Sequence, residues 1–320
     1  MHLKTVFVHL GPANASHLWA NIRRFNKLFP NQPTAVILSD AKHIPRVNAK
    51  KNEIYIYRTT EEDELILSKL AHNMKFRQGF WRFSIERFYA LRKFHELHPN
   101  SPLLHLESDV LVMPNFPFES FKQIRNLAWE KFNETHDVSA LMYLKAPEDT
   151  FWLTQKLTLT LAQSEKLTDM TALSMLSKNY PDKITLLPGT TQSPEFKTFG
   201  GIFDAAPIGM WLNGRDPRNH RGFIRRFLAL PEAEVNASSL KYGFHPDGLV
   251  SGASLGGEQF NIYNLHIHSK RLTLFGPYWK FFLRLDIRTS TDRRLAVWFS
   301  PWIFLRLLQN YISKRLQRIS

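Results

Sequence analysis

The chain has 320 residues, of which 43% are hydrophobic and 13% aromatic, so it can bury a sizeable core and is not a disordered polymer. This length exceeds the usual single domain, but one large α/β unit with an appendage can fill it. The absence of cysteine excludes a disulfide framework, a thiolate metal site and a thiol nucleophile, and it agrees with a reducing compartment.

The net charge of +14 is distributed unevenly along the sequence. From Lys270 onward there are 11 of the 42 Lys/Arg residues and 2 of the 28 Asp/Glu residues, so this last segment carries +9. A nucleic-acid-binding protein of this size would cluster its basic residues over the main domain, so we expect no nucleic-acid partner. The basic segment instead predicts a negatively charged surface as its partner.

The first elements predict an α/β sheet. Residues 1–10 contain only a brief apolar stretch, which His2, Lys4 and His9 interrupt, so a first strand at 5–10 is expected and not a signal peptide. A helix that Asn14 or Ser16 can cap follows, and strands are expected at 34–38 and 53–57. No window is long and apolar enough to cross a bilayer, so we expect a chain that does not span one.

Polar or flexible residues stand at the carboxyl ends of the first two predicted strands. Ligands of open α/β sheets bind outside these ends. His9, Gly11 and Asp40 are therefore candidates for lining a nucleotide pocket, although a role in turns is the simpler interpretation of each.

The segment 80–91 has helical spacing and many aromatic residues, which are most simply core. Arg82 and Glu86 are four residues apart on one helical face, so a mutual ion pair is one interpretation. The other places Arg77 or Arg82 beside a diphosphate group.

Glu107-Ser108-Asp109 is the most informative motif. It ends the apolar run 103–106 and precedes a second short apolar run at 110–112. Two carboxylates where a buried strand turns are hard oxygen ligands of the kind that Mg²⁺ or Mn²⁺ prefers, and such an ion can hold a diphosphate. The alternative is a turn cap or a surface ion pair.

A glycine-rich loop follows a predicted strand at 138–144, a helical region at 151–179 and a strand at 183–187. In this loop, residues 200–209, Asp204 is a candidate to accept a hydroxyl proton or to bind sugar hydroxyls, and the alternative is a helix N-cap. The later loop acids Asp247 and Glu258 have no spacing that identifies a role, and Glu258 is retained as a second catalytic candidate.

His266 and His268 would point to one face of a strand, with Ile267 on the other. Such a pair can ligate a metal or can be a hydrogen-bonded core feature. Lys270 could then offset phosphate charge as a compact point charge.

Taken together, the acidic triplet, the Asp204 loop and the late His-x-His-Ser-Lys sequence resemble metal-dependent glycosyltransferases of the GT-A fold over roughly residues 1–270. The resemblance implies a Rossmann-like mixed sheet flanked by helices, a nucleotide-diphosphate sugar as donor, and Mn²⁺ or Mg²⁺ held by an acidic motif and a late histidine. In this sequence ExD replaces the family's DxD, so Asp109 is the safer ligand and Glu107 the more doubtful one. Whether transfer retains or inverts the anomeric configuration is left open.

Residues 271–320 are expected to form a separate basic and aromatic extension. Ser300-Pro301 is a good helix start, and an apolar stripe with basic residues beside it follows, as in helices that lie on anionic membranes. The alternative is a helix docked on the catalytic domain or at a dimer interface.

The sequence therefore predicts a glycosyltransferase at the cytoplasmic face of a membrane, which transfers a sugar to a glycan or a lipid-linked acceptor in cell-surface polysaccharide synthesis. Two other classes remain open. One is a non-catalytic protein that binds an anionic polymer or partner. The other is a metal-dependent phosphoester hydrolase, which uses the same types of ligand.

Overall fold

The computed structural model describes residues 3–13, 15–45, 52–70, 79–213, 232–244 and 250–268. Arg77, Asp247, Lys270 and the predicted extension 271–320 lie outside the described residues, so the expectations placed on them remain predictions.

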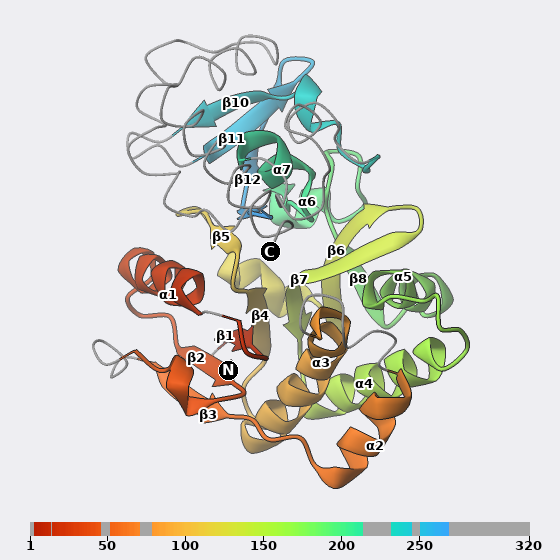
Figure 1. Cartoon of the computed structure of the whole chain (residues 1–320). Coiled ribbons are helices and arrows are strands. Elements are labelled where there is room, and N and C mark those ends of the chain that lie inside the picture. Colours follow the sequence, from red (N-terminus) through yellow and green to blue (C-terminus); the bar gives the residue numbers. More distant parts are fainter. Residues whose placement is uncertain are drawn as a thin grey trace, which may run out of the picture.

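A mixed seven-stranded sheet is the centre of the molecule (Figure 1). In spatial order its strands are β3 (Glu53–Ile56), β2 (Thr34–Leu38), β1 (Lys4–His9), β4 (Leu103–Glu107), β7 (His136–Leu144), β6 (Leu127–Asn133) and β8 (Ile184–Leu187). The first four are parallel, β7 is antiparallel to β4 and β6, and β8 is parallel to β6. The chain continues from β1 to β2 on one side and later returns to β4 on the other, so the sheet has a topological switch point at β1 and β4.

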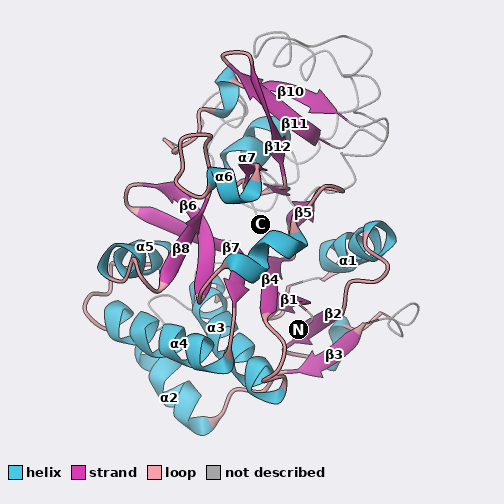
Figure 2. Cartoon of the chain, turned by 180° about the vertical axis from the view of Figure 1, so that it is seen from behind, coloured by secondary structure: helices cyan, strands magenta, loops and turns pink. Residues whose placement is uncertain are grey.

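Helices cover both faces of this sheet, as its strands require when side chains on both faces are apolar. They are α1 (Ser16–Leu28), α2 (Glu61–Leu70), α3 (Phe80–Leu97), α4 (Pro147–Leu161) and α5 (Asp169–Asn179). On one face, α1 packs its apolar stripe against alternate strand residues such as Phe7 and Val36. On the other face, the helices α2 to α5 pack against the intervening residues such as Val6 and Ile37. Figure 2 shows α2, α3 and α4 grouped together, away from α1.

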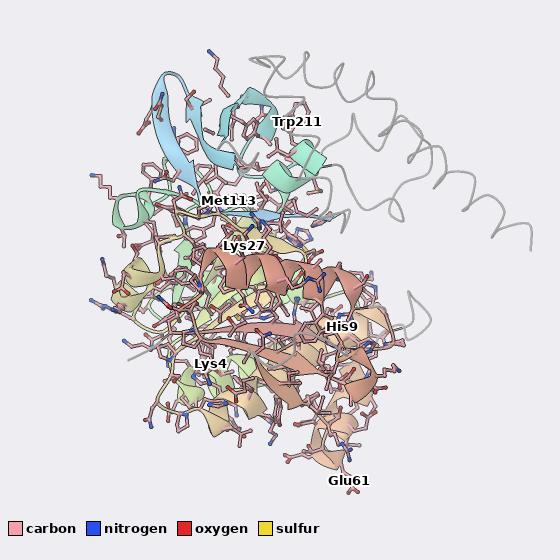
Figure 3. All side chains as sticks on the ribbon, turned by 90° about the vertical axis from the view of Figure 1, so that its left-hand side faces the viewer. Lys4, His9, Lys27, Glu61, Met113 and Trp211 are labelled. Atoms are coloured by element: carbon pink, nitrogen blue, oxygen red, sulfur yellow. The ribbon has the colours of Figure 1, made fainter. Side chains whose placement is uncertain are left out.

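A second part of the molecule is built from two smaller sheets. β5 (Val110–Val112) pairs with β13 (Asn264–His266), and a four-stranded sheet has the order β10 (Lys241–Phe244), β11 (Val250–Leu255), β12 (Glu258–Ile262) and β9 (Gly201–Ile202). Two short helices, α6 (Phe196–Phe199) and α7 (Pro207–Asn213), lie with the four-stranded sheet in the upper part of Figure 1. In the side view of Figure 3, Met113 lies between Lys27 of α1 and Trp211 of α7, and Met113 and Trp211 share one apolar core cluster.

Short 3-10 turns complete the described elements. These are η1 (Ala41–His43), η4 (Phe118–Gln123) and η5 (Ala237–Ser239). None of the described helices combines the length and the hydrophobicity that a bilayer crossing demands.

The predicted α/β class with a mixed, helix-flanked sheet is confirmed, as are the strands around 5–10, 34–38, 53–57 and 138–144. The predicted Ser16 cap is wrong, because Ser16 already belongs to the helix and Ala15 precedes it without a side-chain cap; Asn14 lies outside the described residues. The helical region at 151–179 is divided into α4 and α5, and α5 begins with a capping box at Thr168.

Candidate metal centre

The acidic triplet forms the turn between β4 and β5, at the switch point of the large sheet. Glu107 is the last residue of β4, and Ser108 and Asp109 lead directly into β5. The antiparallel pairing of β5 with β13 places His266 opposite Val110, next to this turn. Glu107, Asp109 and His266 each offer one ligand atom, and the three atoms lie within 4.8 Å of one another. Within the described part of the chain, this is the one group of acids and histidines with such spacing.

The hydrogen bond of His266 fixes which ring nitrogen faces the acids. Its Nδ1 lies 2.8 Å from the carbonyl oxygen of Ala205, so Nδ1–H is the donor. A neutral ring then carries its lone pair on Nε2, which lies 3.5 Å from Oε2 of Glu107 and 3.7 Å from Oδ1 of Asp109. Three atoms with lone pairs converge here, and the two carboxylates, whose charge Arg87 offsets in part, favour a cation among them. These ligand atoms therefore suit a divalent ion. A metal-bound histidine usually donates its other ring N–H to a carbonyl or a carboxylate, as His266 does to Ala205.

Glu107 divides its two oxygens between two partners. Oε1 accepts a hydrogen bond from the guanidinium of Arg87 on α3, and Oε2 faces His266. The same guanidinium donates to Asp169 at the start of α5, at 2.7 Å. Burial lowers the pKa of Arg87, and the Asp169 carboxylate opposes this effect. Arg87 therefore holds the longer glutamate side chain in reach of the site.

His266 is held by a buried acid, Asp204, in the loop between β9 and α7. Asp204 is fully buried, and its two oxygens accept backbone N–H groups from Ile208, Gly209 and His266 at 2.7–3.1 Å. Two of these amides belong to α7, whose amino-terminal end favours a negative charge. Burial raises the pKa of Asp204 to about 6 in spite of these hydrogen bonds. This geometry is that of the helix-capping alternative, because both oxygens accept backbone N–H groups.

A second buried acid lies behind Asp204. Glu130 of β6 accepts hydrogen bonds from the Asn264 side chain at 2.8 Å and from the Leu141 amide at 3.1 Å. Asn264 in turn accepts the backbone N–H of Asp204 at 3.0 Å. Burial raises the pKa of Glu130 to about 8.

The predicted nucleotide-pocket residues gather near the carboxyl ends of β1 and β2. His9 lies beside α1 (Figure 3), and its ring contacts the rings of His17 and His43 at centroid distances of 5.9 and 5.1 Å. Gly11 has φ +87°, and a Cβ there would lie 2.5 Å from the Phe83 ring, so the position requires glycine. Asp40 caps η1 through the Lys42 amide and forms an exposed ion pair with Lys42, as in the simpler turn interpretation.

The metal cluster of the described residues does not include the other predicted residues Arg82, Glu258 and His268. Arg82 pairs with Glu86 at 3.3 Å and with Glu64 of α2, which is the ion-pair interpretation. Glu258 is exposed at the β11–β12 hairpin. His268 stacks edge-on against His266, with centroids 4.5 Å apart, and the buried Ile267 donates its N–H to the Asp109 carbonyl.

Sequence reasoning missed Arg87 and the polar residues of α1 that touch the turn, His17 and Asn21. Arg87 lies about one turn before Leu91 and two turns before Phe94, so the three residues occupy positions i, i+4 and i+7 of one helical face. A single basic residue in an otherwise apolar stripe was therefore the sequence signal that could have identified Arg87. His17 and Asn21 are likewise four residues apart, on a helix whose neighbouring residues form the apolar stripe.

Comparisons with known proteins find similarity among solved structures alone. No protein-family model and no curated protein matches the sequence. Among solved structures, the galactosyltransferase LgtC in complex with donor and acceptor sugar analogues is similar over 58% of this chain and 73% of its own, with 11% identity and a TM-score of 0.41. The PaToxG glycosyltransferase is similar over 56% of this chain and 69% of its own, with 8% identity and a TM-score of 0.39. For mouse xyloside xylosyltransferase 1 the values are 58%, 84%, 15% and 0.36. At these scores and identities the comparisons do not define a family for this chain.

Proposed function

We propose that this protein is a metal-dependent glycosyltransferase that uses a nucleotide-diphosphate sugar. The observation that carries the proposal is the convergence of Glu107, Asp109 and the Nε2 lone pair of His266 at the switch point of an α/β sheet. A mixed set of two carboxylates and one imidazole suits Mn²⁺, and it also accepts Mg²⁺.

The position in the sheet supports a nucleotide ligand. The parallel strands β1, β2 and β4 end at one edge, where β4 runs into the acidic turn and β1 and β2 are followed by Gly11 and Asp40. A nucleoside on the β1–β2 side would place its diphosphate beside Asp109. The bound ion would supply a Lewis acid for the departing diphosphate.

The chain's own residues give this site its form. Arg87 orients Glu107, and the Ala205 carbonyl orients His266. We assign Asp204 to the support of His266, because its oxygens are occupied by backbone amides. The described residues contain a single cluster of this kind, which favours single-metal chemistry over a two-metal phosphoester hydrolase.

The acceptor and the location rest on the sequence alone. We propose that the basic extension 271–320 binds an anionic membrane surface and brings the site to a glycan or lipid-linked acceptor. Deletion of residues 296–320 should release the protein from anionic liposomes and leave hydrolysis of a soluble donor largely intact. Unchanged liposome binding would contradict this part of the proposal.

The main experiment is a thermal-shift screen of nucleotide sugars with and without Mn²⁺. We expect Mn²⁺-dependent stabilisation by a nucleotide-diphosphate sugar, because a ligand that binds only the folded state raises its melting temperature. Asp109→Asn should keep the fold and lose this stabilisation. The control is Asp149→Asn, a buried aspartate on α4 that accepts a hydrogen bond from Asn126 and lies outside the metal cluster.

Two outcomes would contradict the proposal. If Asp109→Asn retains full metal-dependent stabilisation, the assignment of the ligands is wrong. If no nucleotide sugar stabilises the wild-type protein with Mn²⁺, and a simple phosphoester is hydrolysed without a sugar acceptor, the hydrolase class is favoured instead.

A further inference from the structure

Asn21 is a buried polar residue on the apolar side of α1. It is 2% exposed and lies among the buried residues Leu18, Ile22 and Phe25 that face the large sheet. Burying an amide in such a position costs free energy unless its two N–H groups have acceptors.

Both of these hydrogen bonds go to the acidic turn. The Asn21 side-chain amide donates to the Ser108 carbonyl at 3.3 Å and to the Val110 carbonyl at 2.6 Å. The carbonyl between them, that of Asp109, accepts the backbone N–H of Ile267 at 2.8 Å. Three successive carbonyls of the turn are thus bonded, two of them by one side chain.

His17 adds a contact from the same side of the helix. It precedes Asn21 by one turn, and its Nε2 lies 2.8 Å from the Ser108 hydroxyl. The side of α1 that faces the turn therefore touches both the backbone and the side chain of the residue between the two acids.

We infer that Asn21 is a positioning residue that fixes the backbone on both sides of Asp109, so that the Asp109 carboxylate stands at the distance from His266 that a divalent ion requires. The inference rests on the proposed function of the metal site. Asn21 does not touch the ion; it acts through the Ser108 and Val110 carbonyls. Groups that orient metal ligands in this way typically change metal affinity ten- to a hundredfold when they are replaced.

The test is the Mn²⁺ dissociation constant of Asn21→Leu, measured by electron paramagnetic resonance without any substrate. Leucine has a similar volume but no donor, and we expect affinity to fall about tenfold or more. The matched control is Asn26→Leu on the same helix, since Asn26 bonds Asn52 and Thr34 and no residue of the turn. His17→Ala should weaken affinity less than Asn21→Leu, because the contact of His17 with the Ser108 hydroxyl does not hold the backbone of the turn.

A second readout needs no metal. Hydrogen exchange of the Ile267 amide should accelerate in Asn21→Leu and stay unchanged in Asn26→Leu, because this amide bonds the Asp109 carbonyl. If the leucine variant does not fold, Asn21→Ser, which is too short to reach both carbonyls, provides the same comparison.

The outcomes separate this inference from the proposed function. If the wild-type protein binds no Mn²⁺, the proposed metal site fails. If it binds Mn²⁺ and Asn21→Leu binds equally well, the metal site stands and the positioning role of Asn21 is overturned. If both leucine variants lose affinity in proportion to their loss of thermal stability, Asn21 is merely structural and the inference is likewise overturned.

Discussion

The two sides of the candidate metal centre are held by different means. On the carboxylate side, Glu107 and Asp109 belong to a turn that side chains from two helices secure, Arg87 from α3 and Asn21 from α1. On the histidine side, His266 is secured by its own backbone N–H and ring N–H, which bond Asp204 and the Ala205 carbonyl within a buried loop. Changes on the carboxylate side should therefore alter metal affinity first, whereas changes on the histidine side should alter stability first.

The largest expected loss of stability comes from Gly209→Ala on the histidine side. A Cβ at this position would lie 2.1 Å from the His266 carbonyl oxygen, so the backbone must shift. We expect the free energy of unfolding to fall by roughly 2–3 kcal/mol, measured by urea denaturation, in spite of alanine's better helix propensity.

The control is Gly189→Ala, where the added Cβ would meet the flexible end of the Glu234 side chain at 3.0 Å. If both variants are equally stable, the close packing of α7 against β13 is not rigid, and the contrast between the two sides weakens.

An intermediate effect, counted per pH unit, is expected in the pH dependence of stability. The pKa of Glu130 is raised by burial from 4.5 to about 8 in the folded state, so between these values the folded protein binds more protons than the unfolded chain. Stability from this group is present below pH 4.5 and is lost as the pH rises towards 8. The slope approaches about 1.4 kcal/mol per pH unit within this window.

The measurement is the free energy of unfolding from pH 5 to 8 for the wild type and for Glu130→Gln. The variant should lack this contribution to the slope, whatever its absolute stability. Identical slopes in the two proteins would show that Glu130 does not carry the proton and does not make the stability of the histidine side depend on pH.

The smallest effect is expected from Glu258→Gln. Glu258 is exposed in the β11–β12 hairpin, so the melting temperature should change by no more than about 1 °C. The Mn²⁺-dependent stabilisation of the protein by a nucleotide-sugar donor should also be unchanged. A hundredfold loss of transfer activity with an unchanged melting temperature would instead support the earlier expectation that Glu258 takes part in catalysis.

The sequence was sufficient for elements whose pattern is local. The apolar runs of β1, β2 and β4 stand out, and the acids that end β4 are visible beside the run that they terminate. β6 was missed because Glu130 and Lys131 interrupt its apolar pattern, and Glu130 is buried only because Asn264 and the Leu141 amide meet it from distant parts of the chain.

The candidate site divides in the same way. Glu107, Asp109 and His266 were named from their residue types and their places at strand ends, and the structure brings these three together. Arg87 and Asn21 were not named, because their importance depends on which turn lies opposite their helices. Asp204 was named as a catalytic candidate with helix capping as the alternative, but the backbone amides that bond its oxygens come from two elements whose contact no local pattern predicts.

The pairing of β5 with β13 has a consequence for how the protein comes into being. The acids are in place when the first half of the chain has been made, but their nitrogen partner stands at the end of the described residues and reaches them only through this strand pair. A nascent or prematurely terminated chain that stops before β13 thus has the carboxylates without the imidazole. The proposed site could therefore bind a divalent ion only late in biosynthesis, after β13 has been made and has paired with β5.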